Sequence, residues 1–229
     1  MHPVLNYFRS SIGRKQIIGL AGIYLYFFLL IHLVGNLGLL SGPEFFNGYG
    51  HLMLHTLKKV VIPIEFTLLA AFLAHIGLSL KLTIENRAAR PDRYAVNASK
   101  ADRGPYAKFM MLTGTWLLLF VIAHVPHMRF GAYSGVELVV YNGVEMRDLY
   151  GTAMRFFAKP WFAAFYVFSF AMLFSHLAHG VQSSLQSLGL NHPRWNAAIK
   201  FASRAYAVLI CGGFAALAVW AYMQKGAVG

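Results

Sequence analysis

The stretch from Trp161 to Gly189, WFAAFYVFSFAMLFSHLAHGVQSSLQSLG, decides how the rest of the chain is interpreted. Its first 25 residues, to Leu185, are apolar apart from small hydroxyl groups, one glutamine and two histidines. A helix rises about 1.5 Å per residue, so this run is long enough to cross a bilayer core of about 30 Å. An ionisable side chain deep in such a run is costly, and His176 lies deep in it. His176 is therefore a candidate functional residue.

The chain of 229 residues contains four other apolar runs, and 58% of its residues are hydrophobic against 12% charged. This composition is typical of a membrane protein. We expect an all-α integral membrane bundle that forms a single domain over residues 1–229. The five expected transmembrane helices are 17–40, 60–82, 109–128, 161–185 and 206–223. The loops are too short for a soluble catalytic domain, which needs about 100 residues, so a water-soluble substrate must bind to a partner chain.

The basic residues are unevenly divided between the two ends of these helices. The N-terminal segment, residues 81–108 and residues 194–204 hold 13 of the 20 lysines and arginines. The positive-inside rule then predicts a cytoplasmic N-terminus and an outer C-terminus. The net charge of +12 follows from this topology and does not indicate nucleic acid. We expect a cytoplasmic partner to dock on the N-terminus and on loops 83–108 and 186–204.

Three of the other runs carry a histidine at nearly the same depth as His176. His32, His75, His124 and His176 are each the sixteenth residue of their runs. Because successive helices alternate in direction, His32 and His124 share a depth near the outer face. His75 and His176 share a depth near the cytoplasm, and the two layers are about 15 Å apart.

Two histidines that face each other at one depth can supply both axial nitrogens of a haem iron. A single intramembrane histidine serves equally as a hydrogen-bond partner between helices or as part of a proton path. Four at matched depth, each with small residues near by, favour two b-type haems stacked across the membrane. Cys211 is the only cysteine and no Cys-x-x-Cys-His motif occurs, which excludes an iron–sulfur cluster within the chain and a c-type haem.

Two further histidines lie one helical turn beyond the candidates. His127 follows His124, and His179 follows His176. Spacing alone does not choose within either pair, although the deeper member matches the depth on the other helices. The other role for His127 and His179 is beside the ligands, for example in contact with a haem propionate.

Four segments surround the candidate histidines: LLIHLVGNL at His32, FLAHIGLSL at His75, FVIAHVPHMR at His124 and FSHLAHGVQSSLQSLGLNHP at His176. With these segments the chain resembles, over nearly its whole length, the five-helix, two-haem cytochrome b subunit of bacterial succinate dehydrogenases and fumarate reductases. The resemblance implies that His32 and His124 ligate a distal haem, and His75 and His176 a proximal haem. The depth comparison gives the same pairing.

The resemblance also implies a multi-pass protein of the bacterial inner membrane, its partners and a reaction. A flavoprotein subunit with covalent FAD and an iron–sulfur subunit would dock on the cytoplasmic face. Electrons would pass between succinate and membrane menaquinone through the clusters and haems, with this chain as the quinone-reacting subunit. One departure concerns Phe174, because one fumarate reductase branch has at this position a glutamate linked to transmembrane proton transfer. That proton route is not carried over to this chain.

Electrons that arrive at the cytoplasmic haem leave from the outer one, so we expect the quinone beside His32 and His124. The outer segment from Ser41 to Lys59 has the pattern of a short helix at the membrane surface. It contains polar side chains among aromatic ones, namely Glu44, Asn47, His51 and His55. Glu44 and His51 are the expected quinone contacts, because such groups bind quinone oxygens and pass protons. The competing position is a cytoplasmic site near the iron–sulfur partner.

Two other functions fit parts of this pattern. A cytochrome b anchor of another quinone-linked dehydrogenase or a hydrogenase shares the haems but has a different partner. A cofactor-free, proton-coupled transporter would use the histidines as a proton relay. A reduced-minus-oxidised visible spectrum distinguishes the transporter from the two cytochromes.

Overall fold

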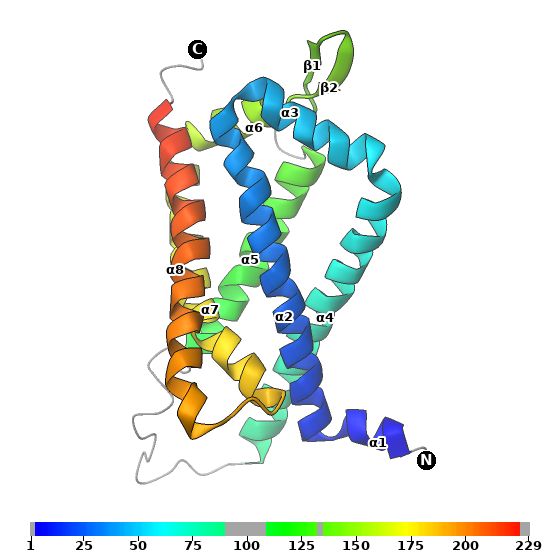
Figure 1. Cartoon of the computed structure of the whole chain (residues 1–229), viewed down its shortest axis with the longest axis vertical. Coiled ribbons are helices and arrows are strands. Elements are labelled where there is room, and N and C mark those ends of the chain that lie inside the picture. The colour runs from blue at the N-terminus through cyan, green and yellow to red at the C-terminus, as the bar shows by residue number, and fades with distance from the viewer. Residues whose placement is uncertain (1–2, 90–108, 132–134, 225–229) are drawn as a thin grey trace.

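The computed structural model describes residues 3–89, 109–131 and 135–224. Five long helices cross the molecule side by side, with shorter elements at both ends (Figure 1). In chain order the elements are α1 Pro3–Arg9, α2 Ser11–Leu37, the 3-10 turn η1 Gly38–Ser41, α3 Pro43–His51, the π-helical turn η2 Leu52–Thr56, α4 Lys58–Ala88, α5 Met110–Phe130, β1 Leu138–Tyr141, β2 Val144–Arg147, α6 Leu149–Phe157, α7 Pro160–Ser187 and α8 Pro193–Met223.

Helices α2, α4, α5, α7 and α8 are each long and apolar enough to cross a membrane. The expectation of an all-α bundle with five such helices is confirmed. Successive long helices run in opposite directions, so the described chain starts at one end of the bundle and finishes at the other (Figure 1). The expected short surface helix after the first span is also present as α3. The expected loop 83–108 is wrong over its first residues, because α4 continues to Ala88, and most of the rest lies outside the described residues.

The helices extend beyond the apolar runs at several ends. The expected loop over 186–204 is wrong from Pro193 onward, because α8 begins there. The ring Nδ1 of His192 accepts a hydrogen bond from the backbone N–H of Arg194, and Pro193 occupies the first turn, where its missing N–H costs little. Helix α2 likewise starts early, where the Ser10 hydroxyl accepts from the backbone N–H of Gly13. Hydropathy detects only the lipid-compatible part of a helix, so these polar extensions escaped it.

Helix α7 lies at the centre of the packing and contacts α2, α5 and α8. Small residues permit these close approaches. A side chain at Gly180 would collide with the Tyr26 hydroxyl of α2, and one at Gly213 of α8 would collide with Leu33. On α8, Ala207 is fully buried.

Helix α4 lies at the edge of the bundle and has a single fully buried residue, Leu82. It runs along α2. Ion pairs hold both of its ends: Glu85 pairs with Arg14 of α2 at 2.5 Å, and Glu65 pairs with Arg129 of α5 at 2.8 Å. The side of α4 that carries His75 therefore meets the bundle interior without the close packing seen between α7 and α8.

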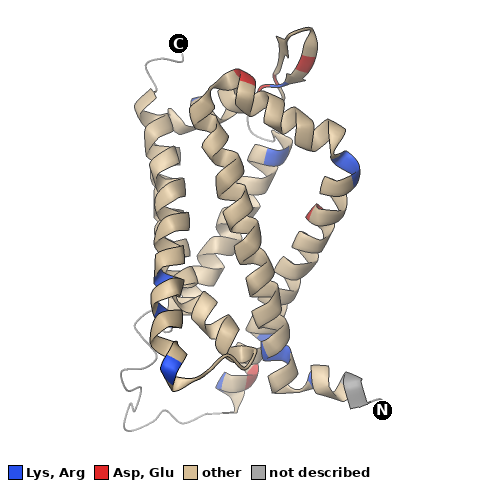
Figure 2. Ribbon diagram, in the orientation of Figure 1, with Lys and Arg blue, Asp and Glu red and all other residues tan. Residues whose placement is uncertain are grey.

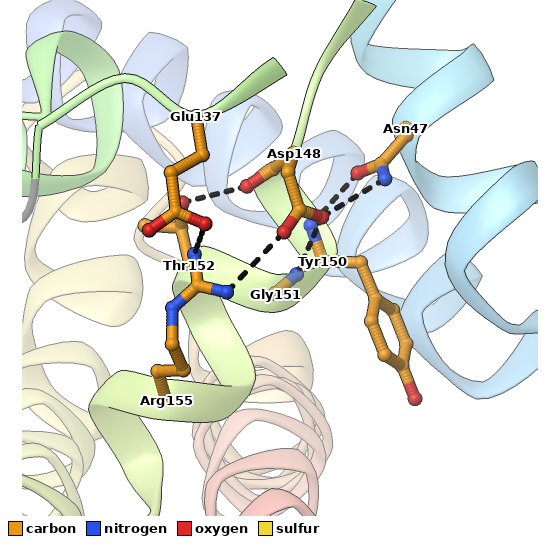
Figure 3. Close-up of polar contacts among 7 residues, drawn as sticks. All are labelled: Asn47, Glu137, Asp148, Tyr150, Gly151, Thr152 and Arg155. Carbon is orange, nitrogen blue, oxygen red and sulfur yellow. Dashed lines mark hydrogen bonds and ion pairs between the residues drawn. The ribbon is translucent and has the colours of Figure 1, made fainter. Parts of the chain in front are cut away.

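Helix α3, the β1–β2 hairpin and α6 form a cap over the upper end of the bundle (Figure 1). Two residues with positive φ, Asn142 and Gly143, make the hairpin turn, as a two-residue turn requires. Asn47 of α3 is fully buried and ties the cap together. Its amide donates to the carboxylate of Asp148 at 3.1 Å and accepts from the backbone N–H of Tyr150 at 2.8 Å (Figure 3).

The two ends of the bundle differ in charge (Figure 2). In the described residues the lower end carries one acidic side chain, Glu85, among several lysines and arginines. The upper end carries both signs; its acidic residues are Glu44, Glu65, Glu137, Glu145 and Asp148. The lower end is therefore the more basic of the two.

Candidate functional site

The structure brings the four candidate histidines together as two pairs. His32 of α2 faces His124 of α5 in the upper half, with ring centroids 6.0 Å apart and ring planes at 84°. His75 of α4 faces His176 of α7 in the lower half, with centroids 6.3 Å apart and planes at 64°. These are the two pairs that the depth comparison forms. All four side chains are partly exposed, although they lie inside the bundle.

These separations match the geometry of a shared metal ion. Imidazole nitrogens bind metals at about 2 Å, and each nitrogen lies about 1 Å from its ring centre, so two axial imidazoles place their centroids about 6 Å apart. The described residues contain no group of three or more histidine, cysteine, aspartate or glutamate side chains that could hold a metal ion. Each pair supplies two nitrogens, so a metal between them would take its other donors from a cofactor or from water. A haem provides four in-plane nitrogens and needs two axial ones, so the residues of both pairs fit it.

In the lower pair, hydrogen bonds determine which ring nitrogen carries the proton. His75 Nδ1 lies 3.3 Å from the carbonyl oxygen of Ile18, which can only accept, so Nδ1–H donates. His176 Nδ1 lies 3.2 Å from the hydroxyl of Thr113. That hydroxyl donates its own proton to the carbonyl of Phe109 at 2.9 Å, so it accepts from His176 Nδ1–H. Both rings therefore keep an unprotonated Nε2, which is the form that binds a metal.

Glycines and small side chains surround the lower pair. A side chain at Gly114 of α5 would have its Cβ 3.4 Å from Cε1 of His176, and one at Gly22 of α2 would lie 3.7 Å from Cε1 of His75. The same Cβ at Gly22 would lie only 3.0 Å from the hydroxyl oxygen of Ser184. Glycine at these two positions therefore lets α2 and α5 approach the rings closely.

Aromatic rings surround the upper pair instead. Phe28 stacks on His32 at 5.1 Å and Phe120 stacks on His124 at 5.3 Å, each one turn earlier on the same helix. Nδ1 of His124 lies 3.0 Å from the hydroxyl of Tyr166, and either group can donate. The contact between His32 Nδ1 and the Asn36 amide is longer, at 3.4 Å. The chain therefore orients the upper rings but does not determine their protonation as fully as in the lower pair.

The alternative histidines have different surroundings. His127 is 1% exposed, and its ring stacks on Phe156 of α6 and Phe162 of α7. It takes part in the packing of α5 against those helices, whereas His124 faces His32. His179 is partly buried one turn below His176 on α7.

The two expected quinone contacts lie in the cap and its connection to α4. Glu44 is exposed on α3 and accepts a hydrogen bond from the Asn142 amide of the hairpin turn at 3.0 Å. His51 stacks on His55 across the π-helical turn, with centroids 4.4 Å apart. Nδ1 of His51 is buried and has no hydrogen-bond partner within the described chain. Of the two, His51 thus keeps a polar atom available for a ligand.

Sequence reasoning missed the groups that orient the rings. Thr113 and Tyr166 stand in apolar runs as ordinary polar residues, and the Ile18 contact uses a backbone carbonyl. Their spacing gives a partial signal, because Thr113 lies eleven residues before His124 on α5 and so at the level of the lower pair.

No protein-family model, curated protein or solved structure matches this chain.

Proposed function

We propose that this chain is the membrane-anchor cytochrome b subunit of a succinate:quinone oxidoreductase, with His32 and His124 as ligands of a distal haem b and His75 and His176 as ligands of a proximal one. The observation that carries the proposal is the pairing of four histidines from four helices at about 6 Å, with an oxygen that can accept a hydrogen bond beside Nδ1 of both lower rings. Bound haem would supply reversible one-electron chemistry at its iron. The two histidine pairs would hold the iron, and the neighbouring side chains and backbone groups orient the histidine rings.

The distance between the pairs suits electron transfer from one layer to the other. His75 lies beside Gly22 of α2, and His32 is ten residues further along the same helix, or about 15 Å. On α5, Gly114 lies beside His176, and His124 is again ten residues further on. Two helices thus give the same spacing, in agreement with two cofactors arranged across a membrane.

The charge distribution supports a cytoplasmic position for the lower end. By the positive-inside rule, the basic lower end lies in the bacterial cytoplasm, as does the N-terminus. The flavoprotein and iron–sulfur subunits would dock there, on the N-terminus and on segments 83–108 and 186–204. Of these segments, residues 90–108 lie outside the described residues. The His75–His176 pair would be the one nearer to the iron–sulfur subunit.

We place the menaquinone reaction near the upper pair, at the segment formed by α3 and η2. A π-helical turn is uncommon and frequently marks a functional site. Here it stacks His51 on His55 and leaves the buried Nδ1 of His51 without a hydrogen-bond partner in the described chain. Glu44 is the second proposed contact, and it would have to release the Asn142 amide to bind a quinone.

Partner identity and electron flow test this function together. The tagged chain is purified with its partners from native membranes, and succinate is added under anaerobic conditions. We expect a co-purifying protein with covalent flavin and reduction of the haem bands by succinate. Haem bands with a different dehydrogenase partner would indicate another quinone-linked anchor. A preparation without haem absorption would support the transporter alternative.

Quinone turnover in variants tests the proposed quinone site separately. We expect His51→Ala and Glu44→Gln to lower turnover with a quinone analogue while both haems remain bound. Unchanged turnover in both variants would eliminate this site and favour a cytoplasmic-side quinone.

A further inference from the structure

The guanidinium group of Arg147, at the end of β2, is placed with most of its donors unused. Nη1 donates to the backbone carbonyl of Arg129, near the end of α5, at 2.8 Å. Nε and Nη2 are buried and make no hydrogen bond within the described chain. Burial of donors without an acceptor costs free energy, and more so for a charged group. The contact with α5 therefore uses Nη1 and leaves Nε and Nη2 without an acceptor in the described chain.

The unused donors of Arg147 are the two nitrogens with which an arginine binds a carboxylate in a bidentate manner. Nε and Nη2 point the same way and form two parallel hydrogen bonds to the oxygens of one carboxylate. Arg129 shows this arrangement in the same molecule, because its Nε and Nη2 contact the two carboxylate oxygens of Glu65 at 2.8 and 3.4 Å. Arg155 binds Glu137 and Asp148. Arg147 has no such carboxylate among the described residues.

The surroundings of Arg147 favour an added anion. Burial and the nearby charge of Arg129 both lower the pKa of Arg147 from its usual value. Beside Nη2 lies Gly131, whose φ of 68° ends α5; a Cβ there would lie 3.1 Å from Nη2, so only a glycine lets the backbone approach the guanidinium this closely. The neighbouring acidic groups Glu65 and Asp148 already hold other arginines. Neither of these carboxylates is therefore available to Arg147.

The position of Arg147 relates it to the upper histidine pair. It contacts α5 at Arg129 and Gly131, five and seven residues beyond His124, or about 8 and 10 Å along the helix. A haem carries two propionate side chains with carboxylates that extend from one edge of its ring. Resting on the proposed function, we propose that Arg147 binds a propionate carboxylate of the haem held by His32 and His124.

A guanidinium group bound to a haem propionate would affect the redox equilibrium of the haem iron. The oxidised iron carries one more positive charge than the reduced iron, so a nearby guanidinium favours reduction. We expect Arg147→Gln to lower the midpoint potential of the upper haem and to leave that of the lower haem unchanged. Arg147→Lys keeps the charge but not the two-donor edge, so it should shift the potential less. Arg155→Gln, which removes an arginine paired within the cap, is the matched control and should shift neither potential.

The measurement is a redox titration of the purified complex, with resonance Raman spectra of the propionate bending modes. A pyridine haemochrome assay on the unchanged protein comes first, and a haem content near zero would contradict the proposed function itself. With both haems bound, the proposal expects altered propionate modes of the upper haem in Arg147→Lys and Arg147→Gln. An unchanged upper potential and unchanged modes in Arg147→Gln would overturn it. Loss of a bound anionic lipid from that variant, with the potential unchanged, would also overturn it and assign the site to a lipid phosphate.

Discussion

The two histidine pairs have nearly the same separation but are held in different ways. In the lower pair, His75 Nδ1 lies beside a backbone carbonyl, which can only accept, and His176 Nδ1 lies beside a threonine hydroxyl whose own proton has a backbone carbonyl as acceptor. In the upper pair, His124 contacts a tyrosine hydroxyl that can donate or accept, and His32 has a longer contact with an amide. The lower pair is therefore fixed in orientation and protonation by α2 and α5, and the upper pair chiefly in orientation by stacked rings.

Although the four histidines stand at matched depths and the two pairs have similar ring separations, the two sites are not equivalent. Partners of Nδ1 set the basicity of Nε2 and hold the ring, and their loss typically costs about 10–100-fold in metal affinity or activity. We therefore expect the lower site to depend strongly on its hydrogen-bond acceptors. The upper site should depend more on Phe28 and Phe120, which stack on its rings.

The largest expected effect comes from removal of a lower ligand. His75→Ala should abolish the lower haem and leave the upper one bound, because an axial nitrogen is lost from one pair only. The haem-to-chain ratio should fall from two to one, as measured by pyridine haemochrome. A ratio that stays at two would show that His75 is not a ligand.

Removal of an upper ligand should have the reverse result. His124→Ala should abolish the upper haem and leave the lower one bound. His127→Ala is the matched control on the same helix, and both haems should remain because His127 packs on Phe156. If instead His127→Ala removed the upper haem, the assignment of His124 would be wrong.

A smaller effect is expected from Thr113→Val, which removes the acceptor of His176 Nδ1–H and keeps the shape of the side chain. Both haems should still bind, but affinity for the lower haem should fall by about 10–100-fold. Haem loss to apomyoglobin, followed by absorbance, measures the change. Thr83→Val is the control, since that hydroxyl bonds to Ser79 and not to a histidine. Equal loss in both variants would mean that the Thr113 contact has no special role.

The smallest effect is expected from Tyr166→Phe in the upper pair. The hydroxyl is lost, but the ring contacts of Tyr166 with Phe120 and Phe170 remain possible. Affinity for the upper haem should therefore fall less than affinity for the lower haem falls in Thr113→Val. The same transfer assay compares the two variants directly, and a larger loss in Tyr166→Phe would reverse the comparison between the pairs.

The sequence predicts the pairs because helix rise converts residue position into depth, and His32, His75, His124 and His176 stand equally far along their runs. It does not predict the Nδ1 partners, because these depend on which face of α5 or α7 points inward. The cap is missed for a similar reason: Asn47 and Asp148 are 101 residues apart in the chain. The hairpin has a local signal in Asn142-Gly143, the dipeptide that favours a two-residue turn.

The haem content of the purified chain tests most directly whether the two histidine pairs each bind a haem. Pyridine haemochrome quantifies haem b, and amino-acid analysis of the same sample quantifies the chain. We expect two haems per chain, with low-spin visible spectra as expected for bis-histidine ligation. A ratio near zero in folded, membrane-extracted protein would contradict it.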